Sequence, residues 1–284
     1  MGFPKSSLAA PDPLPQFENP QSIFDLLNFQ LHEFLGISGS LVTRICENEY
    51  GITREEADAF AVRSHQNAAR AWAENRFAEQ LVPVAIPQRK GEPVIFDHDE
   101  GYRTDASMVT LGKLAPIDLR RDSAAIVTAG NASQQNDAAA ACLVVAEDKL
   151  EELGLTPMLW FGGWAAAGCD PSRMGIGPVP AVERLFERRG YSWDDIGMVE
   201  LNEAFAPQVL AVLKGWGWSA DDSRREMLNV NGSGISLGHP IGATGGRILA
   251  DMAHEMQRRG VRYGLETMCI GGGQGIAAVF ERAE

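Results

Sequence analysis

The clearest chemical signal in this sequence is a glycine-rich segment that surrounds His239. Residues 229–246 read NVNGSGISLGHPIGATGG. Glycines let the backbone turn tightly and approach another group closely, and Pro240 suits the first turn of a helix. The pattern therefore places His239 on a rigid loop at the start of a helix predicted over residues 240–259. The N-terminus of a helix disfavours an imidazolium ion, so we expect a neutral ring that accepts a proton. A histidine that caps the helix or fills the core is the alternative.

A second segment combines a thiol with three consecutive glycines. Residues 268–275 read MCIGGGQG and lie between two predicted strands. Glycines in such a place make sense where backbone N–H groups must point at a ligand oxygen, as in an oxyanion hole. A thiol close to those positive dipoles has a lowered pKa, so Cys269 could act as an acid, a base or a nucleophile. A buried structural cysteine beside a β-bulge is the alternative.

A third segment, Asn202-Glu203-Ala204-Phe205, follows a predicted strand and precedes a predicted helix. A carboxamide at such a junction can hold a water molecule or a carbonyl oxygen, although an asparagine at a helix start is commonly only a cap. The chemistry predicted for the three segments requires an imidazole, a thiol and a carboxamide to converge on one carbonyl group.

Composition restricts the class of protein. The chain has 284 residues, enough for two compact domains, with 45% hydrophobic and 22% charged residues and a formal charge of −13. An acidic surface repels nucleic acid, and an anionic substrate would need a local basic patch. Four cysteines without CxxC spacing indicate free thiols in a reducing compartment and no zinc site. The absence of a signal peptide and of an apolar run of roughly 20 residues favours a cytoplasmic protein without a membrane span.

The first half of the chain is mixed in texture. Residues 3–21 are rich in proline and predict an irregular segment, and a helix is expected over residues 22–35. A second helix should begin at Thr53, which forms a capping-box pattern with Glu56. Later segments are predicted as a loop-rich region over residues 81–122, a buried strand at 124–128, a polar turn at 129–137, a short helix of small residues and an apolar run at 142–146.

The second half alternates between helices and strands. Such alternation indicates an α/β layered domain in which helices pack on a sheet. Helices are predicted at 180–189, 205–214 and 240–259, and strands at 198–201, 264–268 and 276–280.

Taken together, the three chemical segments and their order resemble the thiolase family. Further matching segments are residues 127–133 with Asn136-Asp137, residues 174–181, and residues 50–56. The resemblance runs from about residue 39 to the end, and the pair of motifs GHPxGxxG and CxGGGxG is highly specific. It implies a thiolase-like α/β/α C-terminal domain at 151–284, the end of the N-terminal thiolase domain at 123–150 and a loop and substrate-binding subdomain at 1–122.

The resemblance also implies roles for individual residues. Asn202 would hold a water that, with His239, stabilises a thioester enolate or oxyanion. His239 would also accept the proton of the nucleophilic cysteine, Cys269 would shuttle the substrate α-proton, and the amide of Gly271 would belong to a second oxyanion hole.

Other positions match the part of the family that binds coenzyme A. Ser133 would contact pantetheine, Phe205 with Ala204 would line its tunnel, and Arg103 falls where the family meets the nucleotide. No metal site and no resident cofactor are expected, since coenzyme A would be a substrate or product.

One part of the family pattern is not found. Thiolases form an acyl-enzyme on a cysteine in an N-terminal α/β domain that precedes the matching region, and Cys46 lies at the wrong place to be that cysteine. Three explanations remain open: a second chain supplies the missing half, the native product is longer, or the chain is a non-catalytic relative.

The expected function is therefore a thiolase-type acyltransferase of fatty acid or lipid metabolism. It would act on acyl-CoA by Claisen condensation or by thiolytic cleavage of 3-ketoacyl-CoA, as a homo-oligomer or with a complementary chain. A CoA- or lipid-binding protein without turnover is the alternative. A third interpretation makes Cys269 the nucleophile of a hydrolase with His239 as its base.

Overall fold

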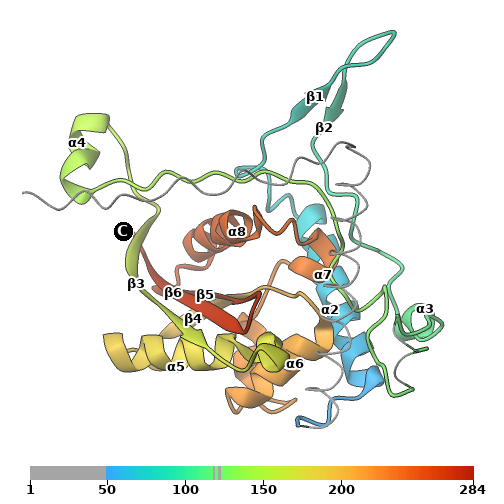
Figure 1. Ribbon diagram of the computed structural model, residues 1–284. Helices are drawn as coiled ribbons and strands as arrows, with labels where there is room; N and C mark the ends of the chain where they lie inside the picture. Colours follow the sequence, from blue (N-terminus) through green and yellow to red (C-terminus); the bar gives the residue numbers. More distant parts are fainter. Residues whose placement is uncertain (1–48, 118, 121–122) are drawn as a thin grey trace, which may run out of the picture. The chain divides into compact units, whose positions relative to one another are not determined.

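The computed structural model describes residues 49–117, 119–120 and 123–284, and the elements belong to one unit, Gly39–Glu284 (Figure 1). The helix predicted over residues 22–35 and Cys46 lie outside the described residues. In chain order the elements are α2 (Arg54–Ala73), β1 (Val84–Ile86), β2 (Val94–Phe96), α3 (Met108–Leu111), the 3-10 helix η1 (Glu147–Lys149), α4 (Leu150–Leu153), β3 (Leu159–Gly168), η2 (Pro171–Ile176), α5 (Pro178–Arg189), β4 (Ile196–Leu201), α6 (Ala206–Gly215), η3 (Ser223–Met227), α7 (Gly234–Leu237), α8 (Thr244–Arg259), β5 (Tyr263–Ile270) and β6 (Gln274–Arg282).

Four strands form the central sheet in the order β3-β6-β5-β4. Strand β4 runs parallel to β5, whereas β6 is antiparallel to both of its neighbours. The strands predicted at 198–201, 264–268 and 276–280 are confirmed as β4, β5 and β6, but β3 was not predicted. Its Gly162-Gly163 pair is typical of a loop, and here it forms a bulge. The side chains of Tyr191 and Arg189 occupy the space that a Cβ at these glycines would need.

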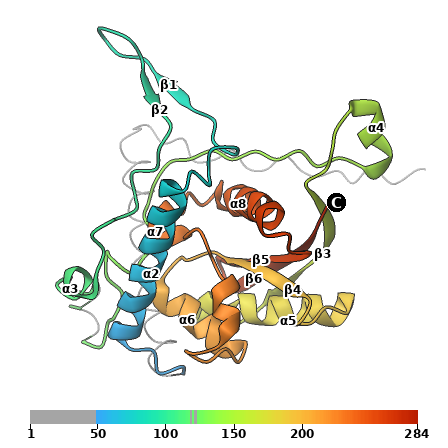
Figure 2. The same cartoon turned by 180° about the vertical axis from the view of Figure 1, so that it is seen from behind.

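Helices cover both faces of this sheet, which confirms the layered α/β fold. Helices α5 and α6 lie on one side and α8 lies on the other, as the two opposite views show (Figures 1 and 2). Neighbouring residues of β4 face opposite layers, because side chains alternate along a strand. Val199 packs in the apolar core with α5 and α6, whereas Met198 packs with Met252 and Met256 of α8.

The helix starts that were predicted from capping and periodicity are mostly confirmed. Thr53 caps α2, and the reciprocal hydrogen bonds of a capping box join Thr53 and Glu56. Helices α5 and α6 occupy the predicted ranges within two residues. Among the described residues, no helix combines the length and apolar character that crossing a bilayer requires. The domain boundaries at 122/123 and 150/151 stay predictions.

The strand predicted at residues 124–128 is wrong. Thr128 is fully buried, but within the described residues the segment has only one isolated β-bridge, which joins Thr128 to Pro116. The side chain of Asn131 forms hydrogen bonds with backbone groups that a neighbouring strand would otherwise pair. It accepts from the Thr128 N–H at 2.8 Å and donates to the Ile126 carbonyl at 3.0 Å. The apolar composition therefore predicted burial correctly and the strand incorrectly.

The helix of small residues predicted after residue 137 is also wrong. Residues 138–146 have no helical structure, and the apolar run that follows is exposed, with 82% of Leu143 and 92% of Val144 accessible. Starting a helix is unfavourable in free energy, and the four alanines at 138–141 have no apolar face packed on the protein to offset it. Within the described residues, no strand pairs with this segment.

The last correction concerns the start of α8. The helix begins at Thr244, and residues 240–243 form a turn in which the Pro240 carbonyl accepts from the Ala243 N–H at 2.8 Å and from the Thr244 N–H at 2.9 Å. Gly242 lies within this turn, where its low helix propensity disfavours an earlier start. His239 therefore precedes a turn and does not lie directly at the helix N-terminus.

Candidate active site

The loop that carries His239 is held to the end of β4 by buried polar side chains. Asn229 adopts a left-handed conformation with φ of 46°, and its side chain bonds to both the N–H and the carbonyl of Leu201 at 2.9 and 2.8 Å. Gly238 has φ of 90°, and a Cβ there would overlap the side chain of Asn136. The N–H of His239 donates to the Gln134 carbonyl at 3.1 Å. Hydrogen bonds and close packing therefore hold the glycine-rich loop at several points, and its rigidity stays a prediction.

The hydrogen bonds of His239 decide which ring nitrogen carries the proton. The Thr244 hydroxyl has a single proton and donates it to the Pro240 carbonyl at 2.9 Å. Thr244 Oγ1 also lies 2.7 Å from His239 Nδ1, so at that contact the hydroxyl oxygen must accept and Nδ1 must donate. The second nitrogen, Nε2, consequently keeps its lone pair. In this state His239 is a neutral base whose accepting atom is Nε2.

The carboxamide of Asn202 lies against that lone pair. Asn202 Nδ2 is 3.3 Å from His239 Nε2, which is a donor facing an acceptor given the proton on Nδ1. The Asn202 Oδ1 atom is buried and has no hydrogen-bond partner among the described residues. The backbone N–H of Asn202 donates to the Thr267 carbonyl at 3.1 Å. Asn202 therefore bonds to both the His239 loop and strand β5.

Burial and a neighbouring cation keep His239 neutral. Burial lowers the pKa of His239 below its usual 6.5, and the positive charge of Arg247 lowers it further. The expected neutral ring is thus found, but its cause differs from the one predicted, because α8 starts five residues later. At neutral pH the ring is free to take a proton.

Cys269 lies near the end of β5, two residues beyond Thr267, and is paired with Gly275 of β6. The predicted lowering of its pKa is wrong, since burial raises the pKa of the Cys269 thiol to about 11. No hydrogen bond joins its Sγ to His239 or Asn202. Gly271 begins the turn that connects β5 to β6. Cys269 is half-buried as a residue, but the protein around its thiol disfavours the thiolate, so Cys269 is suited to an acid rather than to a nucleophile at neutral pH.

Three of the predicted coenzyme A residues lie together beside Asn202. The N–H of Ser133 donates to the Ala204 carbonyl at 2.9 Å, and the preceding residue, Ala132, forms a β-bridge with Phe205. Arg103 is positioned from another direction, since its N–H donates to His65 Nδ1 at 3.2 Å. Burial lowers the pKa of His65 to about 4, which keeps this nitrogen an acceptor.

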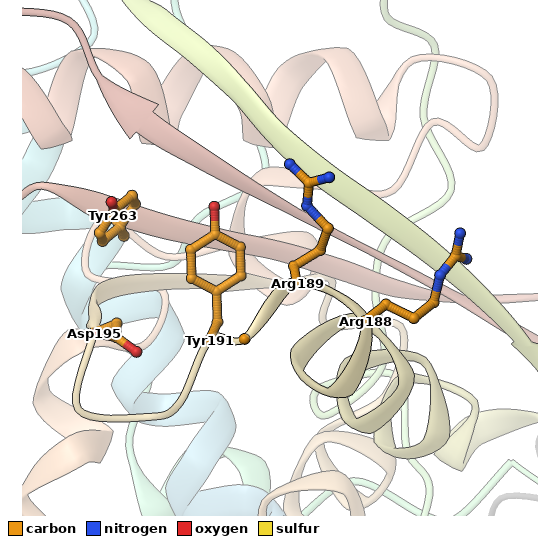
Figure 3. A pocket seen from close by; sticks show the side chains of 6 residues that line it. Arg188, Arg189, Tyr191, Asp195 and Tyr263 are labelled. Carbon is orange, nitrogen blue, oxygen red and sulfur yellow. The ribbon is translucent and has the colours of Figure 1, made fainter.

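A separate polar pocket lies at the C-terminal end of α5, at the opposite end of β5 from the thiol. Figure 3 shows Arg188, Arg189, Tyr191, Asp195 and Tyr263 around it. None of the predicted site residues lines this pocket, so it belongs to a different part of the surface. Within the described residues, no group of three or more His, Cys, Asp or Glu side chains is arranged to hold a metal ion.

Comparison with protein families identifies the fold. The model of the thiolase N-terminal domain matches residues 21–148, and the model of the thiolase C-terminal domain matches residues 155–282. The chain belongs to the thiolase family.

Individual relatives agree with this assignment. The thiolase chain is 50% identical over 234 residues to an acetyl-CoA acetyltransferase of Chromobacterium violaceum, which covers 82% of this chain and 58% of that protein. It is 46% identical over 249 residues to a 3-ketoacyl-CoA thiolase of Idiomarina loihiensis, covering 87% and 62% of the two chains.

Solved structures show the same fold. The acetyl-CoA acetyltransferase of Bacillus anthracis superposes with a TM-score of 0.77 at 41% identity, covering 85% of this chain and 59% of that chain. The human mitochondrial 3-ketoacyl-CoA thiolase gives a TM-score of 0.76 at 35% identity, covering 86% and 60%. The chain spans about three fifths of the length of the relatives it matches.

Sequence reasoning missed three residues that organise this thiolase site. Thr244 fixes the proton of His239, and Gln134 bonds to the carbonyls of Gly101 and Ile235 through its side chain, at 2.7 and 3.2 Å. Thr244 could have been found because it lies one helical turn beyond Pro240. Gln134 gave no signal, since a glutamine in a polar turn is ordinary.

The third missed residue is Glu203, which is fully buried next to Asn202. Its carboxylate accepts from Ser64 Oγ at 2.6 Å, from Asn229 Nδ2 at 2.9 Å and from the Ile235 N–H at 3.3 Å. Burial raises its pKa above the usual value. Glu203 thus joins α2 to the glycine-rich loop, and a carboxylate inside the predicted tetrapeptide was its only signal.

Proposed function

We propose that this protein takes part in thiolase-type acyl transfer on acyl-CoA thioesters, by Claisen condensation or by thiolytic cleavage of a 3-ketoacyl-CoA. The observation that carries the proposal is the contact between Asn202 Nδ2 and His239 Nε2, in which a neutral base and an amide donor lie side by side. A thioester carbonyl that approaches this pair meets one group that removes a proton and another that stabilises negative charge.

The order of proton transfers follows from the state of each group. His239 Nε2 first accepts the proton of the nucleophilic thiol. The ring then carries N–H groups on both nitrogens, so Nε2 becomes a donor toward the oxygen of the enolate or tetrahedral intermediate. The amide of Asn202 supplies a second donor, directly or through a water. Both donors are preorganised, because Thr244 and Thr267 hold them in place.

Cys269 complements this pair as the acid that returns a proton to the substrate α-carbon in cleavage, and as the thiolate base in condensation. A thiol with a pKa of about 11 is protonated at neutral pH and is a strong base once deprotonated. The same property disfavours the hydrolase interpretation, since a nucleophile at neutral pH needs a thiolate. In the second oxyanion hole, the amide of Gly271 would face the same carbonyl.

The remaining expectations belong to the same proposal. Ser133, Ala204 and Phe205 line the pantetheine path, and Arg103 meets the nucleotide end of coenzyme A. Coenzyme A is substrate or product, and no resident cofactor takes part. In the relatives the acylated cysteine would lie in the part that precedes the matched region, and either a second chain or a longer form of this protein would supply it. The working form is a cytoplasmic oligomer of lipid metabolism.

The proposal is tested with the full chain, acetoacetyl-CoA and coenzyme A, followed by intact mass and acetyl-CoA measurement. The same reaction is repeated after adding the preceding part of the Chromobacterium violaceum relative as a separate polypeptide. We expect turnover in the presence of that polypeptide, and its loss with Cys269→Ala. Coenzyme A binding without turnover in either reaction would instead favour a non-catalytic binding protein, and an adduct on Cys269 would favour the hydrolase.

A further inference from the structure

The pocket at the C-terminal end of α5 is lined by two guanidinium groups that the protein itself does not neutralise. Arg188 and Arg189 occupy the last turn of α5, and Gly190 ends the helix with φ of 76°. In the part of the chain that the structure describes, neither guanidinium forms a hydrogen bond or an ion pair with another residue. In Figure 3 both side chains extend from this turn to the same side. Neighbouring like charges repel each other, so the pair favours an anion that contacts both.

The glycine bulge of β3 brings one of these arginines next to a tyrosine hydroxyl. A Cβ at Gly163 would lie 2.8 Å from Arg189 Nε, and a Cβ at Gly162 would lie 2.7 Å from the Tyr191 hydroxyl. The guanidinium and the hydroxyl therefore lie against consecutive residues of one bulge. Two adjacent glycines weaken a strand, and they occur where another group must approach the backbone closely. At this bulge they give room to two hydrogen-bond donors that converge on the pocket.

A second tyrosine and one carboxylate complete the lining of the pocket. Tyr263, the first residue of β5, contacts Tyr191 edge to face, with ring centroids 5.4 Å apart. Asp195 Oδ2 accepts from the N–H and from the hydroxyl of Ser192, both at 2.8 Å, and these bonds lower the pKa of Asp195. The carboxylate is therefore ionised at neutral pH, and its Oδ1 atom remains an acceptor. The pocket thus combines four donor side chains with a single acceptor.

We propose that this pocket binds a phosphate group, as free hydrogen phosphate or as the end of a phosphate monoester. Phosphate carries a charge of about −1.5 to −2 at neutral pH and has three oxygens that accept strongly. It can therefore bond to guanidinium and phenol donors that approach from different directions. A carboxylate has only two oxygens, and one guanidinium satisfies both of them. The hydroxyl of hydrogen phosphate, or an alcohol of the ester, would donate to Asp195 Oδ1.

The size and the place of the pocket agree with a separate small-molecule site. Its volume is about 430 Å³, within the range of about 300–1,000 Å³ that is usual for such sites. Tyr263 and Cys269 are six residues apart on β5, which is roughly 20 Å at about 3.3 Å per residue. The inference does not use the acyl-transfer groups and stands whether or not that proposal holds.

NMR titration of the ¹⁵N-labelled chain with sodium phosphate tests the site, and sodium chloride at equal ionic strength is the reference. The amide signals of Gly190 and Tyr191 report on the pocket. We expect phosphate to shift them saturably, with a dissociation constant in the millimolar range or below, and chloride to leave them nearly unchanged. A second titration with AMP distinguishes the two sources. Displacement of phosphate by AMP identifies a phosphate monoester as a ligand, whereas saturation by phosphate alone identifies the free ion.

Two variants with a matched control show which side chains hold the anion. Arg189→Gln should raise the dissociation constant for phosphate about tenfold or more, because it removes a charge-assisted donor. Tyr191→Phe keeps the ring contact and loses only the hydroxyl, so binding should weaken about 2- to 10-fold. Arg89→Gln removes the same charge from an exposed position in the β1–β2 hairpin and should have little effect.

Three results would each overturn the proposal. The first is the absence of a saturable shift at Gly190 and Tyr191. The second is an equal response to chloride, which would indicate screening of surface charges and no site. The third is a dissociation constant that Arg189→Gln changes no more than Arg89→Gln does.

Discussion

Replacing Thr244 with valine tests the proton assignment on His239 without altering a reacting group. Valine has the shape of threonine but no hydroxyl, so the Nδ1–H of His239 loses a partner at 2.7 Å. A hydrogen bond of this kind contributes about 0.5–1.5 kcal/mol net, which is about 2- to about 13-fold in an equilibrium constant. The tautomer protonated on Nδ1 should lose that factor relative to the one protonated on Nε2.

The tautomers can be measured directly by ¹⁵N NMR of the chain labelled at histidine. The sequence has 5 histidines, so the signals are few, and His239→Asn identifies the one that matters. In the wild-type chain we expect a ring protonated on Nδ1 that is mostly neutral at pH 6.5, because burial lowers its pKa below that value. Thr244→Val should shift the ring toward protonation on Nε2, whereas Thr244→Ser keeps the hydroxyl and should not. A wild-type ring protonated on Nε2 would refute the reasoning.

Three further predictions concern packing, pH dependence and reactivity. Gly275→Ala should lower the urea midpoint strongly, because a Cβ there would overlap the backbone of Gly177, while Gly242→Ala, in open space, should change it little. Glu266 has its pKa raised by burial to about 8, so between pH 4.5 and 8 the unfolded chain releases a proton that the folded chain keeps, and stability falls as pH rises. Glu266→Gln should therefore stabilise the fold at pH 8 but not at pH 4 in urea titrations, and equal effects at both would contradict this. At pH 8, iodoacetamide should alkylate Cys269 more slowly than it alkylates the free thiol of glutathione, as followed by peptide mass. The reason is that burial raises the pKa of Cys269 to about 11.

The parts of the fold that the sequence predicted are those with local signals. The capping box at Thr53 and the periodic helices α5 and α6 are determined by hydrogen bonds and apolar faces within a few residues. Strand β3 escaped prediction because its Gly162-Gly163 bulge depends on side chains from residues 189 and 191. The strand predicted at 124–128 was wrong because a strand needs a neighbouring strand to pair with, and the sequence of the segment does not show whether one is present.

In the candidate site, too, local sequence signals were predictive and features that depend on the packing of distant segments were not. Residue types and glycine spacing located Asn202 and His239, and the structure places them in contact. The direction of the Cys269 pKa could not be predicted, because burial depends on the packing of other segments and here outweighs the backbone dipoles. Thr244 and Glu203 act through hydrogen bonds whose partners become known only when the loop is folded.

Gln134 has a consequence for how this region opens. Its carbonyl holds the His239 N–H, and its side chain holds the carbonyls of Gly101 and Ile235. Three stretches of chain, around Gly101, Gln134 and residues 235–239, are therefore joined through this one glutamine. If residues 131–137 detach transiently, the segments around His239 and around Gly101 to Arg103 lose their hydrogen bonds to Gln134 at the same time. Their amide hydrogens should then exchange with solvent as one cooperative group.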